Sequence, residues 1–256
     1  GLARAMGSEV ITTPLMRERG DGDLELLRLP PGMAVANAMA QLKGNFAVEY
    51  AEPNWVYYHD ATSNDPYYTN GSLWGMYGDA TSPANQYGSQ AGEAWAKKTD
   101  CSPVWIGIID EGYMHTHEDL AANAGTNPGE IAGNGRDDDG NGYVDDASGW
   151  DFLGPRCLEP RPDGDPSDGH GHGTHVAGTV AARGVGGSGV VGVAPGARVM
   201  AVKGLDDSGS GLDSQLAAAI VYAADNGADV VNASWSGRGV SEAIREAVEY
   251  AAELGV

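Results

Sequence analysis

The stretch Val104-Trp105-Ile106-Gly107-Ile108-Ile109-Asp110 decides the fold, because it is a continuous apolar run that ends abruptly in a carboxylate. Such a run is typical of a strand that is buried on both faces of a parallel sheet. The chain then predicts further strands over 198–202 and 229–233, and helices over 213–225 and 241–254. Strands that alternate with helices predict an α/β fold, in which helices cover both faces of a parallel sheet.

The ends of both predicted helices carry residues that start and stop helices. Asp213 and Ser241 stand at the N-cap positions, where a side-chain oxygen accepts a hydrogen bond from an unpaired backbone N–H. Asn226-Gly227 and Gly255 follow the last turns, where glycine readily adopts the left-handed conformation that ends a helix.

A glycine-rich stretch, Gly169-His170-Gly171-His172-Gly173-Thr174-His175, places three histidines close together. It continues into small residues and so predicts a tight turn that feeds a helix. Asp110 would stand at the carboxyl end of its strand, where open α/β sheets collect catalytic groups. A histidine from this stretch is the obvious partner for the buried carboxylate, and such a pair is the orienter and base of a nucleophilic relay. The alternative is a strand-end aspartate that caps a turn.

Residues 1 to about 58 predict a separate, small α+β module. The pattern indicates a strand over 24–29, a helix over 34–42 and a further strand over 46–50. The residues that follow, 59–66, are polar and rich in turn formers, which is typical of an exposed linker that proteases cleave. We therefore place a domain boundary near residue 60.

Composition excludes several classes of partner. The 256 residues include 36 acidic and 15 basic side chains, so the formal net charge is −21 at pH 7. Such a surface repels nucleic acids and anionic membranes, and it favours divalent cations. No apolar run is long enough to span a bilayer. The two cysteines, Cys101 and Cys157, form either one disulfide in an oxidising compartment or two separate buried thiols.

A second chemical signal is the acidic loop Asp137-Asp138-Asp139-Gly140-Asn141-Gly142-Tyr143-Val144-Asp145-Asp146. Oxygen ligands at alternate positions, with glycines for sharp turns, suit a hard cation, and aspartates this close repel one another without a counter-ion. Ser148 stands where an EF-hand has its last glutamate, so the loop is not an EF-hand. A solvated acidic loop is the alternative. We predict a calcium site with the ligands Asp137, Asp139, Asn141, the carbonyl of Tyr143, and Asp145.

These motifs resemble the subtilisin family of serine proteases. The stretch 106–112, followed by His117-Glu118-Asp119-Leu120, resembles the family's aspartate motif, and 172–178 matches its histidine motif residue for residue. Upstream, Ala51-Glu52-Pro53-Asn54-Trp55 resembles the end of the family's inhibitory propeptide. Further matches are Gly192-Val193-Ala194-Pro195, Val202-Lys203 and Val231-Asn232-Ala233-Ser234.

The resemblance implies a subtilisin-like α/β fold, a parallel sheet with helices on both faces. A small α+β, ferredoxin-like propeptide module would precede it. In these terms residues 1–60 are a partial inhibitory propeptide, and 61–256 are a catalytic domain whose C-terminal part is missing.

The resemblance also implies the catalytic roles. Asp110 would orient His172, the general base, and His175 would be structural. The family's oxyanion asparagine and its nucleophile, in a Gly-Thr-Ser-Met-Ala motif, would both lie beyond Val256, and no Gly-Thr-Ser occurs in the chain. We therefore expect an N-terminal fragment of a protease that is inactive by itself.

The same resemblance implies a groove whose two edges hold an extended peptide by main-chain hydrogen bonds. Its edges would be Gly209, Ser210 and Gly211 on one side, and Ser234, Trp235 and Ser236 on the other. The chain departs from the family pattern at Ser236, where glycine is common, and at Glu111, where serine or threonine is usual. A second calcium site of the family would use Asp119, although the loop at 184–188 lacks the usual asparagines.

We therefore expect a secreted, calcium-binding serine endopeptidase zymogen. Its partners would be polypeptide substrates and its own propeptide, with no nucleic acid and no membrane, and the complete protein would be a monomer. One alternative is a zinc-dependent hydrolase that uses His170, His172 and His175, whose spacing suits a metal. The other is a non-catalytic relative that only binds peptides or calcium, and the presence of both Asp110 and His172 argues against it.

Overall fold

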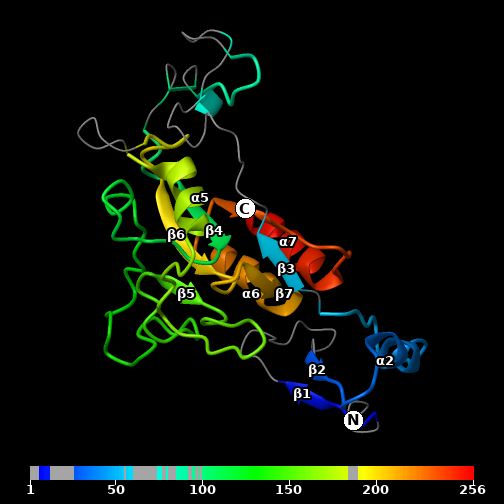
Figure 1. Cartoon of the computed structure of the whole chain (residues 1–256). Helices are drawn as coiled ribbons and strands as arrows, with labels where there is room; N and C mark the ends of the chain where they lie inside the picture. The colour runs from blue at the N-terminus through cyan, green and yellow to red at the C-terminus, as the bar shows by residue number, and fades with distance from the viewer. Residues whose placement is uncertain are drawn as a thin grey trace.

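The computed structural model describes residues 6–11, 26–54, 56–59, 74–76, 79, 85–91, 94–95, 98, 100–183 and 190–256. The strands are β1 (Glu9–Ile11), β2 (Leu26–Arg28), β3 (Val56–His59), β4 (Trp105–Asp110), β5 (Gly149–Asp151), β6 (Arg198–Lys203), β7 (Ser210–Leu212), β8 (Val230–Ala233) and β9 (Trp235–Ser236). The helices are α2 (Val35–Leu42), the short 3-10 helix η1 (Trp74–Met76), α5 (His172–Ala181), α6 (Asp213–Asp225) and α7 (Glu242–Leu254). Figure 1 shows a main body with an N-terminal module, made of β1, β2 and α2, at one side.

The main body contains a four-stranded sheet in the order β5-β6-β4-β8, and all of these strands run parallel. β4 pairs with β6 from Trp105↔Arg198 to Asp110↔Lys203. The parallel sheet of an α/β fold, expected from the sequence, is therefore confirmed.

Helices cover both faces of this sheet. Successive residues of β4 point to opposite faces, so neighbouring residues pack against different helices. Ile109 belongs to a core that contains Leu216 of α6 and Ala247 of α7. Ile108 points the other way, into a second core that contains Ala177 of α5. The arrangement can be followed in Figure 1.

The ends of α7 agree with the prediction, whereas the start of α6 differs. The Oγ of Ser241 accepts a backbone N–H of the first turn of α7 at 3.2 Å, and Gly255, with a φ of 92°, follows its last turn. In α6, Asp213 is the first helical residue and Leu212 holds the N-cap position, so the prediction of Asp213 as the cap is wrong. The backbone N–H of Leu212 is bound instead by the side chain of Gln215, at 3.1 Å.

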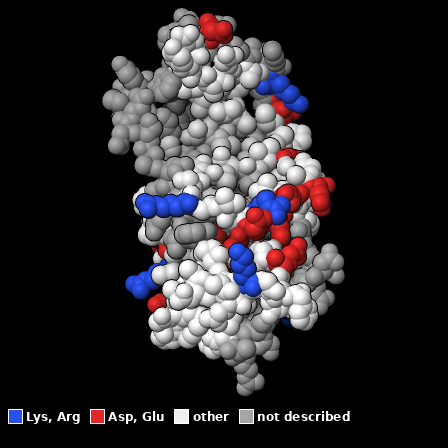
Figure 2. All heavy atoms as spheres, turned by 90° about the vertical axis from the view of Figure 1, so that its right-hand side faces the viewer, with Lys and Arg blue, Asp and Glu red and all other residues white. Residues whose placement is uncertain are grey.

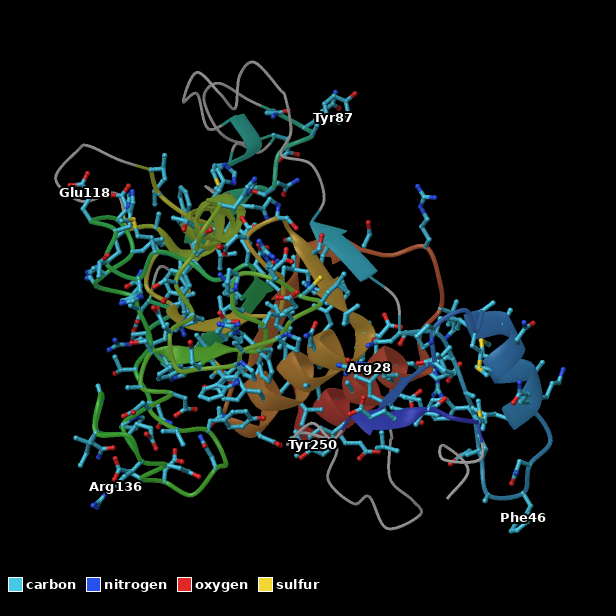
Figure 3. All side chains as sticks on the ribbon, turned by 60° about the horizontal axis from the view of Figure 1, so that its bottom comes forward. Arg28, Phe46, Tyr87, Glu118, Arg136 and Tyr250 are labelled. Atoms are coloured by element: carbon cyan, nitrogen blue, oxygen red, sulfur yellow. The ribbon has the colours of Figure 1, made fainter. Side chains whose placement is uncertain are left out.

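The N-terminal module differs from its prediction in two strands: the sequence does not predict β1, and the strand expected over 46–50 does not form. β1 and β2 pair antiparallel and α2 follows them, as an α+β module requires. The strand predicted over 46–50 is wrong, since these residues form turns and irregular chain. Phe46 is fully exposed, and Figure 3 shows it pointing into solvent, so no neighbouring strand covers the apolar side of this stretch. Trp55 and the linker beyond His59 lie outside the described residues, and the boundary near residue 60 stays a prediction.

β3 joins a different sheet from the rest of the N-terminal module. Its main chain lies between β7 and β9 in an antiparallel sheet of three strands. On one side Tyr57 stands opposite Gly211, and on the other Tyr58 stands opposite Ser236. Residues 56–59 therefore link the N-terminal module to the main body by backbone hydrogen bonds (Figure 1).

The two cysteines are free thiols. Cys157 is buried in the core that contains Ile109, and Cys101 packs against the core that contains Ile108. Because the two thiols belong to opposite faces of the sheet, the disulfide is wrong and the alternative of two separate thiols holds.

The surface over α7 carries both signs of charge. Figure 2 shows clustered acidic side chains on this side of the molecule, with basic side chains beside them. Arg245 forms exposed ion pairs with Glu242 and Glu249, at 2.5 and 2.6 Å. Pairs this exposed add little to stability. In the described part of the chain, no helix has the length and apolar character that crossing a bilayer needs.

Candidate active site

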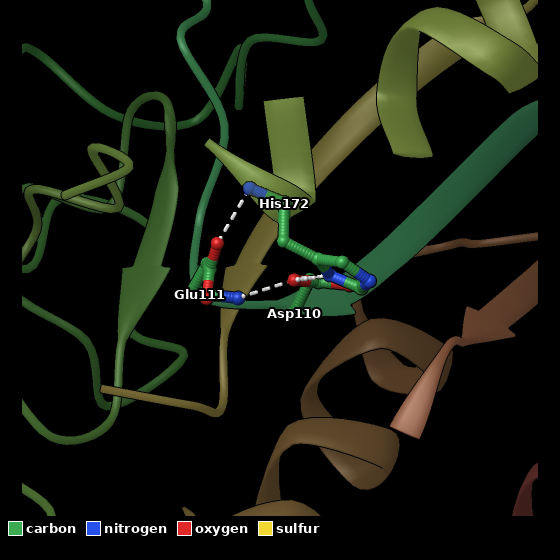
Figure 4. Close-up of side chains that lie close together, drawn as sticks. All are labelled: Asp110, Glu111 and His172. Carbon is green, nitrogen blue, oxygen red and sulfur yellow. Dashed lines mark hydrogen bonds and ion pairs between the residues drawn. The ribbon is translucent and has the colours of Figure 1, made fainter. Parts of the chain in front are cut away.

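Two secondary-structure elements bring Asp110 and His172 together. Asp110 is the last residue of β4, and His172 is the first residue of α5. The Nδ1 of His172 lies 2.8 Å from Oδ1 and 3.1 Å from Oδ2 of Asp110. Both side chains are buried, with 0% and 6% of the Asp110 and His172 surfaces exposed. The structure thus joins the strand-end carboxylate to the glycine-rich stretch (Figure 4).

Glycines permit this close approach. A Cβ at Gly173 would collide with the carbonyl oxygen of Gly112 and would stand 3.1 Å from the Oδ1 of Asp110. Gly171, directly before His172, has a φ of 115°, in the left-handed region that favours glycine. The helix α5 can therefore begin directly against the end of β4.

The pair has the arrangement of a general base with its orienting carboxylate. Burial raises the pKa of Asp110, while the hydrogen bond from His172 favours its ionised form. An ionised carboxylate only accepts hydrogen bonds, so it selects the tautomer in which Nδ1 of His172 carries the proton. The other ring nitrogen, Nε2, points away from Asp110 in Figure 4. An imidazole held in this way can take a proton from a hydroxyl at Nε2.

Two further carboxylates hold the start of α5. Asp168 accepts hydrogen bonds from the backbone N–H groups of Gly171 and Thr174, at 2.6 and 2.9 Å. Glu111, which is fully buried, accepts the backbone N–H of His172 at 2.6 Å. Unpaired N–H groups at a helix start favour negative charge. Sequence reasoning missed Asp168, although an aspartate shortly before a predicted helix start is the signal for such a contact.

The three histidines of the glycine-rich stretch have different surroundings. His170 lies with its Nδ1 2.9 Å from Glu111, His172 binds Asp110, and His175 is exposed about one turn further along α5. Among the described residues, groups of acidic and histidine side chains converge closely enough for a metal ion at two places, and neither place contains more than one histidine. The zinc alternative needs all three histidines at one point, so the structure does not support it.

The residues predicted to hold a peptide lie on the two strands that flank β3, or directly before these strands. They are Gly209, Ser210 and Gly211 at β7, and Ser234, Trp235 and Ser236 at β9. The indole Nε1 of Trp235 donates a hydrogen bond to the carbonyl oxygen of Ile109 at 3.1 Å, which ties β9 to the strand that carries Asp110. The main chain of β3 runs between the two edges.

The N-terminal module also binds two helices of the main body. Glu52 accepts the backbone N–H groups of Glu242 and Ala243 at the start of α7, at 2.5 and 2.9 Å. Asn54 binds Ser214 in the first turn of α6 twice: its Oδ1 accepts the backbone N–H at 2.9 Å, and its Nδ2 donates to the Oγ at 3.0 Å. The residues just before β3 therefore cap both helices that cover one face of the sheet.

The acidic loop gathers a different set of carboxylates from the predicted one. Ligand atoms of Glu130, Asp137 and Asp139 all lie within 4.8 Å of one another. Asp145, a predicted ligand, instead accepts the backbone N–H groups of residues 134–135, at 2.9 and 2.8 Å. The structure thus brings two predicted ligands together and adds Glu130, which sequence reasoning missed because it lies before the alternating pattern.

Asn141 and Tyr143, the other two residues predicted to bind the ion, connect the loop to the core. The side chain of Asn141 donates to the buried Asp146 at 3.0 Å. It also donates to Asp139 of the loop at 3.3 Å. The carbonyl of Tyr143 as a ligand stays a prediction. The ring of Tyr143 packs edge to face on Trp150 and Tyr222, with centroids 5.0 and 4.8 Å apart. These contacts fix the loop to α6 through Tyr222.

The carboxylates of Glu130, Asp137 and Asp139 fit a hard cation. They offer oxygen ligands only, which is the donor type that calcium prefers. The Oε2 of Glu130 is buried and has no hydrogen-bond partner among the described residues. A buried carboxylate oxygen without a donor is stabilised by a positive ion, so the residues present fit calcium.

Asp119, the ligand expected for a second calcium site, is buried. Its Oδ2 accepts the backbone N–H of Val190 at 3.2 Å. The loop at 184–188 that would complete this site lies outside the described residues, and the site stays a prediction.

Comparison with known sequences identifies relatives of both parts of the chain. The profile of the Subtilase family matches residues 102–256, and that of the Fervidolysin N-terminal prodomain matches residues 1–54. The thermophilic serine proteinase of Bacillus sp. (strain AK1) is 36% identical over 214 residues, which are 84% of this chain and 43% of that protein. Thermitase of Thermoactinomyces vulgaris is 34% identical over 197 residues, which are 76% of this chain and 55% of that protein.

A solved structure has the same fold. The crystal structure of fervidolysin from Fervidobacterium pennivorans, a keratinolytic enzyme related to subtilisin, matches with a TM-score of 0.62 and 26% sequence identity. The match covers 100% of this chain and 36% of that one, and it confirms the expected subtilisin-like fold. The chain spans about half or less of the length of these relatives.

Proposed function

Since this chain belongs to the subtilase family of serine proteases, we propose that it carries the base and the orienting carboxylate of an Asp-His-Ser triad that hydrolyses peptide bonds. The observation that carries this proposal is the 2.8 Å contact between the Nδ1 of His172 and the carboxylate of Asp110. The family's Gly-Thr-Ser motif does not occur within these 256 residues. We therefore assign the peptidase activity to the complete gene product, and expect residues 1–256 alone to be inactive.

In the proposed reaction, the Nε2 of His172 takes the proton of the serine hydroxyl while the serine Oγ forms a bond to the substrate's carbonyl carbon. Asp110 keeps the Nδ1 proton in place and stabilises the positive imidazolium. When the peptide C–N bond breaks, the imidazolium gives its proton to the leaving amine. A water oxygen then forms a bond to the acyl carbon while His172 takes a proton from the water. The bond from that carbon to the serine Oγ breaks, and His172 returns the proton to the Oγ, which frees the carboxylic acid product.

We propose that β7 and β9 are the two edges of the substrate groove and that β3 occupies it as an inhibitor. A strand held on both sides by main-chain hydrogen bonds is a mode of binding that suits peptides of many sequences. Glu52 and Asn54 anchor the segment just before β3 to α7 and α6. Residues 1–60 would then act as an intramolecular propeptide, and cleavage after β3 would free the groove. The prodomain match over 1–54 supports this assignment.

We propose that Glu130, Asp137 and Asp139 hold a calcium ion. The ion would neutralise their clustered charges and so stabilise the loop. Asp145 does not belong to this close group of ligand atoms, and its carboxylate binds the backbone N–H groups of residues 134–135, so it would shape the loop rather than contact the ion.

We also propose that the complete protein is secreted and monomeric, and that it acts on extracellular polypeptides. A net charge of −21 favours solubility, and it attracts divalent cations such as calcium. Immunodetection in the culture medium of the source organism tests secretion, and a cell-bound product would contradict it.

The test of the proposed function compares the 256-residue chain with the complete gene product on a fluorogenic protein substrate. We expect hydrolysis only by the complete product, and we expect His172→Ala and Asp110→Asn to remove it. His175→Ala, on the exposed side of the same helix, is the matched control and should keep the activity. An inactive complete product, or stoichiometric zinc in it, would overturn the proposal. Hydrolysis by residues 1–256 that depends on His172 would show that the nucleophile lies within them.

A further inference from the structure

Glu111 is a buried carboxylate for which the proposed triad has no role. It directly follows Asp110 at the end of β4, and its side chain is 0% exposed. Its Oε1 lies 2.6 Å from the backbone nitrogen of His172 and 2.9 Å from the Nδ1 of His170. One carboxylate oxygen therefore binds two residues of the glycine-rich stretch. The left-handed Gly171 between them lets both converge on it (Figure 4 shows the His172 contact).

Two carboxylates divide the capping of α5, and Glu111 is the one that binds the backbone N–H of the proposed base itself. Asp168 already accepts the N–H groups of Gly171 and Thr174 at the helix start. A second carboxylate beside Asp110 is electrostatically unfavourable: burial raises the pKa of Asp110, and the charge of Glu111 raises it further. Two contacts of the Glu111 carboxylate go to the proposed base, His172, and to its neighbour His170.

We propose that Glu111 is a positioning residue for the base. Asp110 holds the ring of His172, and Glu111 holds its backbone, so consecutive residues of one strand fix both parts of the same histidine. The Nδ1 of His170, whose side chain is 48% exposed, lies 2.9 Å from the same carboxylate and helps to keep it turned toward α5. The inference rests on the proposed function, because positioning matters for catalysis only if His172 is the base.

The first test measures the position of His172 without catalysis. The 256-residue chain is labelled with 15N, and NMR follows the exchange with water of the Nδ1 proton between His172 and Asp110. Glu111→Gln keeps an acceptor oxygen for the backbone N–H, whereas Glu111→Ala removes it. We expect exchange about tenfold faster in Glu111→Ala and near the wild-type rate in Glu111→Gln. Glu118→Gln, at an exposed position in the following loop, is the matched control and should leave the rate unchanged (Figure 3).

The second test uses the complete gene product and separates kcat from KM. For Glu111→Ala we expect kcat to fall about tenfold while KM stays within about twofold, because the substrate groove is intact. Glu111→Gln should restore most of kcat. A residue needed only for folding would lower the melting temperature without changing kcat of the folded enzyme.

The outcomes are distinguishable. A wild-type exchange rate in both Glu111→Ala and His170→Ala overturns the positioning role. If circular dichroism shows that Glu111→Ala does not fold, the surface variant His170→Ala decides: faster exchange than in Glu118→Gln supports the role, and an equal rate overturns it. A complete gene product without peptidase activity overturns the proposed function instead, and the exchange measurement still decides the role of Glu111.

Discussion

The carboxylate of Glu52 lies 2.9 Å from the backbone nitrogen of Ala243, so a residue of the N-terminal module caps a helix of the main body. The same carboxylate also accepts the N–H of Glu242 and the hydroxyl of Ser241, at 2.5 and 3.0 Å. A negative charge at this position interacts favourably with the unpaired N–H groups and the dipole of α7. Docking of the module and stability of α7 are therefore coupled.

Replacing Glu52 by alanine is expected to lower the free energy of unfolding by about 1–2 kcal/mol, because the N–H groups of Glu242 and Ala243 lose their acceptor, whereas the Oγ of Ser241 still binds the next N–H of the turn. Urea denaturation of the 256-residue chain measures the change. Glu49→Ala, three residues earlier and exposed, is the matched control and should change the free energy by less than about 0.5 kcal/mol. Equal values for the two variants would show that the contact contributes no stability.

The carboxyl of Asp151 should make stability depend on pH. Burial raises its pKa to about 6, although the N–H groups of Gly154 and Leu153 and the charge of Lys203 oppose the shift. In the unfolded chain the same group titrates near pH 4, roughly its ordinary value. The native state therefore binds this proton more tightly. Its contribution to stability is complete below about pH 4 and is lost as the pH rises through about 6.

Asp151→Asn should remove this dependence. Asparagine keeps the Oδ1 that accepts the N–H groups of Leu153 and Gly154, both at 2.7 Å, but it cannot ionise. Relative to the wild type, the variant should gain stability between about pH 4 and pH 7, by at most about 3 kcal/mol. Urea denaturation across this range measures the difference, and a difference that does not change with pH would contradict the assignment.

The sequence predicts those elements whose signal lies within the element itself. β4, α6 and α7 are predicted to within one or two residues, because their apolar periods and stop residues are local. The stretch 46–50 also has a local strand pattern, but a strand needs a partner, and Phe46 lies in solvent. β3 forms because β7 and β9, far along the chain, lie on either side of it.

The residues of the candidate site also form two groups: those that a sequence motif identifies, and those whose contacts join distant segments. Asp110 is singled out by its place at the end of a buried strand, and the resemblance to the family's histidine motif selects His172 from the three histidines of the glycine-rich stretch. The contacts of Glu52 with α7 and of Glu111 with His172 join segments that are distant in sequence. Glu130 stands outside the alternating pattern of the acidic loop, and only the folded loop brings it to Asp137.

Calcium should stabilise the chain through Glu130 rather than through Asp145. At a hundredfold excess over its Kd, the ion should add about 2.7 kcal/mol to the free energy of unfolding. Thermal melts in calcium and in EDTA measure this difference. Glu130→Gln should remove most of it, whereas Asp145→Asn should lower stability equally in both buffers. If Asp145→Asn removes the calcium effect and Glu130→Gln does not, the ligand set expected from the alternating pattern is the right one.

Two glycines of α5 should respond in opposite directions to the same substitution. A Cβ at Gly173 would collide with the backbone of Gly112 and press on Asp110, so Gly173→Ala must push the start of α5 away from β4. We expect a loss of about 2 kcal/mol and faster exchange of the proton between His172 and Asp110. At Gly178, in the same helix, an added Cβ has no atom of another described segment within 4 Å, and alanine should stabilise the helix by about 0.5–1 kcal/mol.

Urea denaturation and the NMR exchange measurement check both substitutions on the same chain. A general effect of adding a methyl group to α5 would shift Gly173→Ala and Gly178→Ala in the same direction. Opposite signs, with faster proton exchange only in Gly173→Ala, would attribute the effect to the contact between the helix start and the end of β4. Equal exchange rates in the two variants would mean that the 2.8 Å contact between His172 and Asp110 does not depend on this close approach.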